Sequence, residues 1–450
     1  MPGTEILNQT GVLRMHPSSA CFRLVAALFL LGAAVACNDS TGPVETGPRY
    51  EVWVVDQSNS PGVAYGGTIH VFQDTVLAPE STGAATSTKI DLGGATASMC
   101  MSATGVRPVR PHTIVFNSAR THAVVAFVAS GHVAVINTQT RAPVACVRAL
   151  PGAGGGQQAH HAMVSPDQSM ILVANQNGKR LERIDANFSA NTFTLNAAAA
   201  LDLAGCTTPS GAACQSAALR PDNAPILVEF DGSGNLAFAM LRGGGMFAVN
   251  WRTTPMSIRA EYDSATLKGS GLSPLRVGTS LFISSGTNAF RLYRIPLSGF
   301  SATTATPPNT PAPTVLASSA VTGSDAHGMA GVGSSNFVWI ADRGLNRIDI
   351  FESAGSSKLS SIEMAGSVSG DPAPDLLAVA PKGDRVFVTL KGPNALTGGA
   401  LGTGSTPGVG VIRVDQNGRA GRFLRVVPIS NRDAGGVERA DPHGMAVLVR

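Results

Sequence analysis

The sequence predicts an all-β protein, a seven-bladed β-propeller built from four-stranded antiparallel blades. Three observations support this: a turn-rich composition, seven repeated pairs of short β runs, and a C-terminal run that copies one from mid-chain. Of 450 residues, 51 are Gly and 28 are Pro, while only 5% are aromatic and 14% are charged. This composition is typical of short strands between turns and unfavourable for long helices or coiled coils.

Short runs rich in Val, Ile and Phe recur from Tyr50 onward, separated by turn residues. They form units of four: a first run that often begins with histidine, a Val-rich second run, an alternating third run and a less regular fourth run. Second runs are expected at Val52–Ser58, Ala123–Ser130, Ile171–Asn177, Leu236–Arg242, Leu281–Ser285, Phe337–Arg343 and Val386–Lys391. Third runs are expected at Thr68–Asp74, His132–Thr138, Arg180–Asp185, Met246–Trp251, Arg291–Pro296, Asn346–Phe351 and Gly408–Asp415.

The two ends of this pattern are complementary. No first run precedes Val52, whereas the C-terminal run Asp441–Arg450 (DPHGMAVLVR) has no second run after it. The segment Asp325–Val332 (DAHGMAGV) is its mid-chain copy, as expected for a repeat fold. We therefore predict that the C-terminal run completes the first blade and closes the ring, because closure removes open sheet edges. Residues 50–450 are then a single propeller domain.

The N-terminus predicts export. Arg23 precedes the uncharged run Leu24–Val35, which is too short to span a bilayer but suits a signal peptide over residues 1–36. The run ends in Ala34-Val35-Ala36-Cys37, which resembles a bacterial lipobox, and this implies lipidation of Cys37. The alternative is ordinary cleavage after the small-residue triplet, which leaves Cys37 free. Residues 37–49 form a polar tether, so we expect a lipid-anchored envelope protein, periplasmic or associated with the outer membrane.

Four cysteines remain once those of the leader and the lipobox are set aside. An even number in an exported chain favours disulfides. Cys206–Cys214 would close a short loop rich in Gly, Pro and Ser, and Cys100–Cys146 is the remaining pair. The basic residues are scattered, with no run of five or more Lys and Arg, so the sequence gives no support for nucleic-acid binding.

Several repeats resemble a known family. Ser165-Pro166-Asp167, Ile171–Asn175 and the run Val133–Thr138 resemble the YVTN-repeat propellers, a group with lactonase-like and amine-dehydrogenase-like relatives. The resemblance covers nearly the whole mature chain, although each repeat is degenerate. The stretch from Asp371 to the C-terminal histidine run resembles bacterial and fungal propellers of unassigned function. The resemblance implies the propeller fold and leaves the activity open.

The first runs predict a functional site. In a propeller the first strand of each blade is innermost, and its start lies beside the end of the second strand on one face. Alignment of the first runs places an imidazole or a carboxylate at this mouth in five neighbouring blades, whereas blades 4 and 5 offer neither. These residues are His327 (blade 6), Asp375 (blade 7), His443 (blade 1), His112 (blade 2) and His161 with His160 (blade 3).

Converging imidazoles are the usual ligands of copper, iron, zinc or manganese, and a site with an open position can be catalytic. Asp325 and Asp441 each precede a histidine by two residues, and we expect them to orient these imidazoles through the other ring nitrogen. Two alternatives remain open. The pit could bind a metal-free ligand, or the histidines could be structural, inherited with the repeat and bonded to backbone carbonyls and water.

Polar residues at the ends of the second runs are expected around the same mouth, where a charged rim would suit a small polar or anionic ligand. The simpler interpretation is that turns are polar in any protein. Two functions follow: an envelope protein that binds a small ligand or a protein partner at the pit, or a metal-dependent enzyme, either a lactonase-like hydrolase or an oxidoreductase. The rim residues are Asp56, Asn175, Asn177, Lys179, Arg242, Asp342, Arg343 and Lys391.

Overall fold

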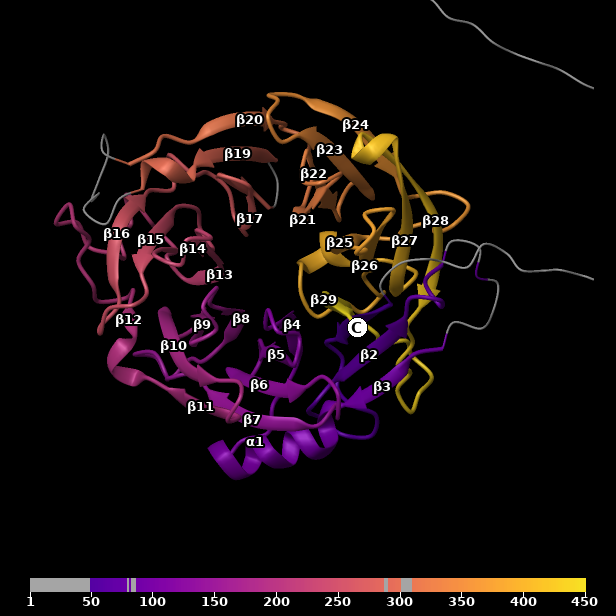
Figure 1. Ribbon diagram of the computed structural model, residues 1–450, viewed down its shortest axis with the longest axis horizontal. Coiled ribbons are helices and arrows are strands. Elements are labelled where there is room, and N and C mark those ends of the chain that lie inside the picture. Colours follow the sequence, from indigo (N-terminus) through magenta and orange to yellow (C-terminus); the bar gives the residue numbers. More distant parts are fainter. Residues whose placement is uncertain (1–48, 79–80, 82–85, 287–289, 301–309) are drawn as a thin grey trace, which may run out of the picture. The chain divides into compact units, whose positions relative to one another are not determined.

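The computed structural model describes residues 49–78, 81, 86–286, 290–300 and 310–450. Its strands form seven sheets arranged in a ring (Figure 1). The predicted seven-bladed propeller is therefore confirmed. Six blades are four-stranded antiparallel sheets, and the third carries one additional short strand, β12, beside β10. The predicted signal peptide, Cys37 and the residues up to position 48 lie outside the described residues.

From blade 1 to blade 7, the innermost strands are β29 (Pro442–Val449), β4 (Pro111–Phe116), β8 (Ala159–Val164), β13 (Pro225–Phe230), β17 (Ser273–Val277), β21 (Ala326–Val332) and β25 (Pro374–Val379). The second strands are β1 (Tyr50–Asp56), β5 (His122–Phe127), β9 (Met170–Asn175), β14 (Ala237–Leu241), β18 (Ser280–Ser284), β22 (Phe337–Asp342) and β26 (Arg385–Leu390).

The third strands are β2 (Thr68–Gln73), β6 (His132–Asn137), β10 (Arg180–Asn187), β15 (Met246–Asn250), β19 (Arg291–Pro296), β23 (Arg347–Glu352) and β27 (Gly408–Asp415). The outer strands are β3 (Thr88–Asp91), β7 (Pro143–Arg148), β11 (Thr192–Leu195) with β12 (Leu201–Asp202), β16 (Ser257–Tyr262), β20 (Thr314–Ser318), β24 (Lys358–Glu363) and β28 (Ala420–Pro428).

Helical structure in the described residues is short. A π-helical turn, η1 (Leu92–Thr96), leads into the helix α1 (Ala97–Thr104). The 3₁₀ turns are η2 (Ala197–Ala199), η3 (Leu297–Gly299), η4 (Gly399–Gly402) and η5 (Gln416–Gly418). None of these helices is long and apolar enough to cross a membrane.

The C-terminal run closes the ring as predicted. β29 pairs antiparallel with β1, with Val447 opposite Val52 and Ala446 opposite Trp53. The sheet order of blade 1 is therefore β29-β1-β2-β3, with the last strand of the chain innermost. This pairing joins the two ends of the propeller and gives blade 1 its innermost strand.

Packing between neighbouring blades forms the core. Seven clusters of buried hydrophobic residues each join the strands of two adjacent blades. The three tryptophans, Trp53, Trp251 and Trp339, are each 0% exposed within such clusters. Strand side chains alternate between two faces, and both faces of each blade meet a neighbour, so most second strands are buried along their whole length.

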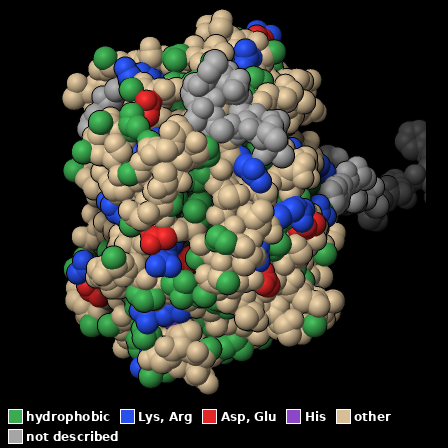
Figure 2. Space-filling model, turned by 90° about the vertical axis from the view of Figure 1, so that its left-hand side faces the viewer, with side chains coloured by type: hydrophobic (Ala, Val, Ile, Leu, Met, Phe, Trp, Pro, Cys, Tyr) green, Lys and Arg blue, Asp and Glu red, His purple; other side chains and the backbone are tan. Residues whose placement is uncertain are grey.

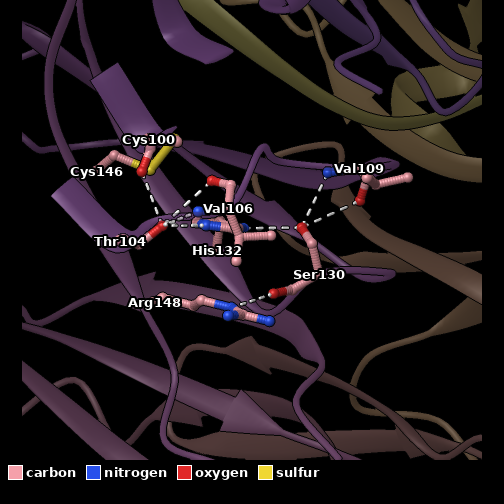
Figure 3. The surroundings of a disulfide bond; sticks show 8 residues. All are labelled: Cys100, Thr104, Val106, Val109, Ser130, His132, Cys146 and Arg148. Atoms are coloured by element: carbon pink, nitrogen blue, oxygen red, sulfur yellow. Dashed lines mark hydrogen bonds between the residues drawn. A yellow bond between two sulfur atoms is a disulfide. The ribbon is translucent and has the colours of Figure 1, made fainter. Parts of the chain in front are cut away.

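Both predicted disulfides are present. Cys100–Cys146 joins α1 to β7 on the outside of blade 2 (Figure 3), and Cys206–Cys214 closes a loop of blade 3. Beside the first disulfide, His132 contacts Thr104 Oγ1 through Nε2 and Ser130 Oγ through Nδ1, at 2.9 Å each (Figure 3). Because both ring nitrogens are occupied there, His132 is part of the scaffold of blade 2.

The strand directions define two faces of the ring. Because neighbouring strands are antiparallel, every innermost strand begins, and every second strand ends, at the same face, which we call the pit face. Backbone hydrogen bonds hold these ends together, for example from Gln57 N to Asp441 O (3.0 Å) and from Arg343 N to Asp325 O (3.0 Å). On the opposite side, which we call the terminal face, β1 begins and β29 ends.

Candidate functional site

Histidines gather inside the ring at the pit face. The outer rim, seen from one side in Figure 2, shows basic, acidic and hydrophobic side chains intermixed and no histidine. Four imidazoles from neighbouring blades form a row. The ring centres of His327 and His443 are 5.6 Å apart, those of His443 and His112 are 3.9 Å apart, and those of His112 and His160 are 4.4 Å apart. The structure therefore brings together imidazoles that the sequence placed on blades 6, 1, 2 and 3.

Two glycines allow this close approach. In both copies of the repeated segment a glycine follows the histidine: Gly328 after His327 and Gly444 after His443. A Cβ on Gly444 would lie 2.5 Å from the backbone oxygen of His112, and a Cβ on Gly328 would lie 2.2 Å from that of Asp375. At each position, the innermost strand of one blade therefore contacts the backbone of the next blade at its candidate ligand.

Backbone carbonyls fix two of the imidazoles. His443 Nδ1 lies 3.0 Å from the carbonyl oxygen of His112, and His160 Nδ1 lies 2.8 Å from the carbonyl oxygen of Ile226. A carbonyl oxygen only accepts hydrogen bonds, so each Nδ1 must carry the hydrogen. In a neutral ring, Nε2 is then the unprotonated nitrogen, with its lone pair free for a ligand.

Gln57 fixes the third imidazole. Its Nε2 donates to Asp441 Oδ2 (3.0 Å) and to Thr397 Oγ1 (2.9 Å), so its oxygen faces His112 Nδ1 at 2.8 Å. The reverse amide orientation would point an oxygen at the Asp441 carboxylate and is excluded on that ground. His112 is therefore also protonated at Nδ1, and its buried Nε2 has no hydrogen-bond partner among the described residues. The sequence analysis missed Gln57, whose only signal is its place directly after a second strand.

His161 does not join the row, although the sequence alignment placed it there ahead of His160. The pairing of β8 with β9 shifts register between Ala159 and His161. His160 lies in this bulge as His112 lies in the equivalent bulge of β4, between Pro111 and Thr113. His160 is therefore the counterpart of His112, and the side chain of His161, the next residue, points to the opposite side of the strand. His161 Nδ1 instead accepts a hydrogen bond from Val228 N at 3.3 Å.

Asp375 lies at the other end of the row. Its Oδ1 contacts His327 Nδ1 at 2.7 Å, and its Oδ2 lies 3.5 Å from His443 Nε2. One ligand atom from each of His327, Asp375 and His443 lies within 4.8 Å of the others. The side chain of Asp375 is 0% exposed and that of His327 is 14% exposed. This group is close to the spacing that the ligands of one metal ion require.

Asp325 and Asp441 each pair with a buried cation. Their expected role beside the following histidines stays a prediction. Asp325 Oδ2 pairs with Arg343 Nη2 at 2.7 Å, while Asp441 pairs with Lys391 Nζ. The reason is geometric: Arg343 and Lys391 directly follow second strands, and these ends lie beside the starts of the innermost strands. The ring nitrogens are held by the next blade, by the Asp375 side chain and by backbone carbonyls.

Five of the eight residues expected at the rim are buried, whereas Asn177 and Arg242 are exposed and Lys179 is partly exposed. Asp56, Asn175 and Lys391 are 0% exposed, Asp342 is 3% exposed and Arg343 is 7% exposed. Oδ1 of Asp56, Asp342 and Asn175 each accepts a backbone N–H from the start of the innermost strand, from Asp441 (2.8 Å), Asp325 (2.9 Å) and Gln158 (2.9 Å). These residues pin the first strand to the second. Arg242 is exposed and pairs with Asp222.

Burial sets the protonation of the row. It lowers the pKa of His160 to about 3, and it holds the pKa values of His112 and His443 well below the usual range, with neighbouring histidines adding to the effect. Burial opposes ionisation of Asp375, but His443, Arg343 and His327 outweigh it and hold the pKa of this carboxyl well below its usual value. At neutral pH, His112, His160 and His443 are therefore neutral imidazoles close to an ionised carboxylate.

Comparison with known proteins addresses the fold. No family model and no curated protein matches the chain. Solved structures match over most of its length. The periplasmic gluconolactonase of Pseudomonas aeruginosa superimposes with a TM-score of 0.56 at 12% identity, over 89% of this chain and 99% of that one. At this identity, the likeness shows a shared fold.

Two further structures show the same fold. A hypothetical selenium-binding protein of Sulfolobus tokodaii superimposes on the propeller with a TM-score of 0.59 at 10% identity, over 90% of this chain and 94% of that one. A functionally unknown protein of Desulfotomaculum acetoxidans superimposes with a TM-score of 0.54 at 12% identity, over 89% of this chain and 99% of that one. Sequence identities this low support a shared fold but say nothing about activity.

Gly444→Ala should disturb the contact between blades 1 and 2. The added Cβ meets the backbone of His112, which cannot move aside as a flexible side chain would. We expect the free energy of unfolding to fall by about 1–3 kcal/mol in urea denaturation. Gly370→Ala is the control, because a Cβ there meets nothing within 4 Å. Equal stability of the two variants would show that the close approach is not needed.

Gln57→Leu should allow His112 to populate both of its neutral tautomers. Without the amide oxygen, nothing holds the hydrogen on Nδ1, so part of the population should move it to Nε2. Nitrogen-15 NMR of histidine-labelled protein distinguishes the two tautomers. Gln73→Leu is the control, since Gln73 bonds to Glu51 away from the pit. An unchanged His112 spectrum in Gln57→Leu would contradict the role given to Gln57.

Proposed function

We propose that this protein is a lipid-anchored propeller of the bacterial cell envelope that binds a small ligand, a transition-metal ion, in its histidine-lined pit. The observation that carries the proposal is the shared tautomer of His112, His160 and His443. Each carries its hydrogen on Nδ1, where it donates to a fixed oxygen, and has an unprotonated Nε2. Metal-binding histidines in proteins are commonly held in this way through the other ring nitrogen.

Unsatisfied buried atoms favour a cation in the pit. His112 Nε2 and Asp375 Oδ2 are buried and lack a hydrogen-bond partner among the described residues. A buried polar atom left without a partner costs about 1–3 kcal/mol, and coordination of a metal removes this cost. Three buried carboxylates, those of Asp325, Asp375 and Asp441, lie at this point, and they pair with the cations Arg343 and Lys391.

The donor types narrow the choice of metal. Imidazole nitrogens with one carboxylate suit copper, iron, zinc or manganese, whereas calcium and magnesium prefer all-oxygen sites. His327, His443 and Asp375 would hold the ion, and His112 and His160 extend the same row.

Export and anchoring rest on other features. Two disulfides lie within the propeller, and disulfides persist in oxidising compartments outside the cytosol. One protein of the same fold is described as periplasmic. The lipobox-like Ala34–Cys37 supplies the anchor. Cys37 then becomes the first residue of the mature protein, followed by a polar tether.

His443→Ala should abolish stoichiometric metal binding. The variant removes one of the three mutually close ligands and the imidazole stacked on His112. After reconstitution without chelator, we expect metal affinity to fall by on the order of a hundredfold or more. Elemental analysis by mass spectrometry gives the stoichiometry, and competition with a chromophoric chelator gives the affinity.

The control for this experiment is His70→Ala, since His70 lies on β2 and bonds to Ser87 away from the pit. Wild-type protein that takes up no metal, or equal metal content in the two variants, would refute the metal site. The pit would then be assigned to a metal-free ligand or to a protein partner at the pit face.

Metal binding should be resistant to acid. Because burial lowers the pKa of His160 to about 3 and those of His112 and His443 below the usual range, these rings stay neutral as the pH falls. An exposed histidine with a pKa of about 6.5 loses its neutral form roughly thirtyfold at pH 5. We therefore expect protonation of these three rings to weaken metal binding less than tenfold between about pH 7 and pH 5, measured by chelator competition at both pH values. Nitrogen-15 NMR that shows any of these three rings protonated at pH 5 would contradict this assignment.

A metal-dependent enzyme is the second candidate. His327 is 14% exposed and His160 is partly exposed, whereas His112 and His443 are buried, so one side of the row is reachable. A bound metal with an open position would supply an activated water or a redox centre. Because one structural neighbour is a gluconolactonase, lactone hydrolysis is the first activity to test, with metal-loaded protein against His443→Ala. Equal rates in both would exclude this use of the site.

A further inference from the structure

The pit and the chain ends lie on opposite faces of the ring. β1 begins at Tyr50 and β29 ends at Val449 on the terminal face, and Arg450 N donates to Arg49 O at 2.8 Å there. The innermost strands that carry the histidines begin at the pit face. Arg49, the first described residue, therefore lies on the side of the propeller away from the pit.

Exposed cations surround this junction. Arg120 lies in the turn between β4 and β5, Lys382 lies in the turn between β25 and β26, and Arg422 lies near the start of β28. All three are exposed, and none has an ion-pair partner among the residues that the structure describes. They belong to blades 2 and 7, which flank blade 1, where the chain enters and ends.

In the ion pairs around blade 1, the carboxylates are buried more deeply than the cations. The side chain of Glu51 is 5% exposed and holds Arg450 at 2.8 Å and Arg141 at 3.0 Å, whose side chains are 36% and 27% exposed. Asp74 is 4% exposed and holds Arg49, which is 64% exposed, at 3.0 Å. The carboxylates are therefore buried while the guanidinium groups reach the surface.

The exposed carboxylates of the same sector do not cancel the positive charge of these guanidinium groups. Asp384 lies against Arg385 at 3.3 Å, and Asp415 lies against Arg413 at 2.7 Å. Each is thus matched by a basic neighbour. Among the described residues, the terminal face of blades 7, 1 and 2, on which the chain enters the propeller, consequently presents an excess of positive charge.

We propose that this sector of the terminal face, which we call the basic sector, rests against an anionic phospholipid surface. The proposal depends on the lipid anchor, since a tether of twelve residues, Asn38–Arg49, spans at most roughly 40 Å. A basic surface held at that distance from anionic lipids is attracted to them. The protein then stands on the membrane with its basic sector and presents the pit to the aqueous compartment.

The test uses the unlipidated chain from Asn38 onward, so that the surface is measured apart from the anchor. The described propeller is closed and has its own complete set of cores between blades. Co-sedimentation with vesicles of phosphatidylcholine and phosphatidylglycerol is compared with co-sedimentation with pure phosphatidylcholine vesicles. At low ionic strength, where the Debye length is about 30 Å, we expect binding to the anionic vesicles only.

Charge-reversal variants test whether the basic sector is the surface that contacts the vesicles. The triple variant R120E/K382E/R422E should weaken binding on the order of a hundredfold. The matched control R107E/K268E/R432E changes the net charge equally, through exposed residues of loops between outer and innermost strands at the pit face, and should bind as wild type does. Equal loss in both triples, or no binding of wild type to anionic vesicles, would overturn the proposal.

The anchor is tested separately by mass spectrometry of the N-terminal peptide of the full-length protein. An unmodified Cys37 would refute the lipid anchor and, with it, the orientation on a membrane. A lipidated Cys37 together with vesicle binding that does not depend on the basic sector would refute only the contact, and the propeller would then sit free of the surface at the end of its tether.

Discussion

The close approach of neighbouring innermost strands is the constraint on which the pit depends. At Gly328 and Gly444 the backbone of the next blade occupies the space of a side chain. Packing at that distance places His443 Nδ1 against the carbonyl oxygen of His112 and brings His327 to Asp375. The glycine after each histidine therefore sets the distance between candidate ligands as well as the spacing of the blades, and the site and the ring share one geometric requirement.

The same packing buries a group of charged side chains beside the pit. Lys391 and Asp375 are completely buried, and Arg343 is nearly so. Buried charges are tolerated only when they are paired and hydrogen-bonded, and removal of one partner from such a pair is costly. The group is continuous from Asp325 through Arg343 to Asp375, and from Lys391 through Asp441 to Gln57. It joins blades 6, 7 and 1 at the point where the chain closes, so the polar lining of the pit also fixes the seam of the ring.

The fold could be predicted because its signals are local or repeated. Strand alternation, turn residues and the duplicated histidine segment can all be identified without knowledge of contacts between blades. The row of imidazoles followed from the same repeat. The details that could not be predicted from the sequence depend on how the strands pair and how the blades pack. The shift before His161 decides that His160 joins the row, and the partner of His327 comes from the next blade. The place of Gln57 after a second strand did not identify its role, because that role depends on His112 in the neighbouring blade.

Because β29 closes the ring, the pit is complete only after this strand has been synthesised. His443 belongs to the last strand of the propeller, whereas its neighbours His112 and Gln57 belong to the first quarter of the chain. During synthesis six blades can acquire their strands in order, but the first blade waits for its innermost strand until the final residues emerge. Assembly of the pit is thus the last event in forming the ring, and an incomplete chain lacks the seam and the site together. Metal occupancy would then report that the protein is complete.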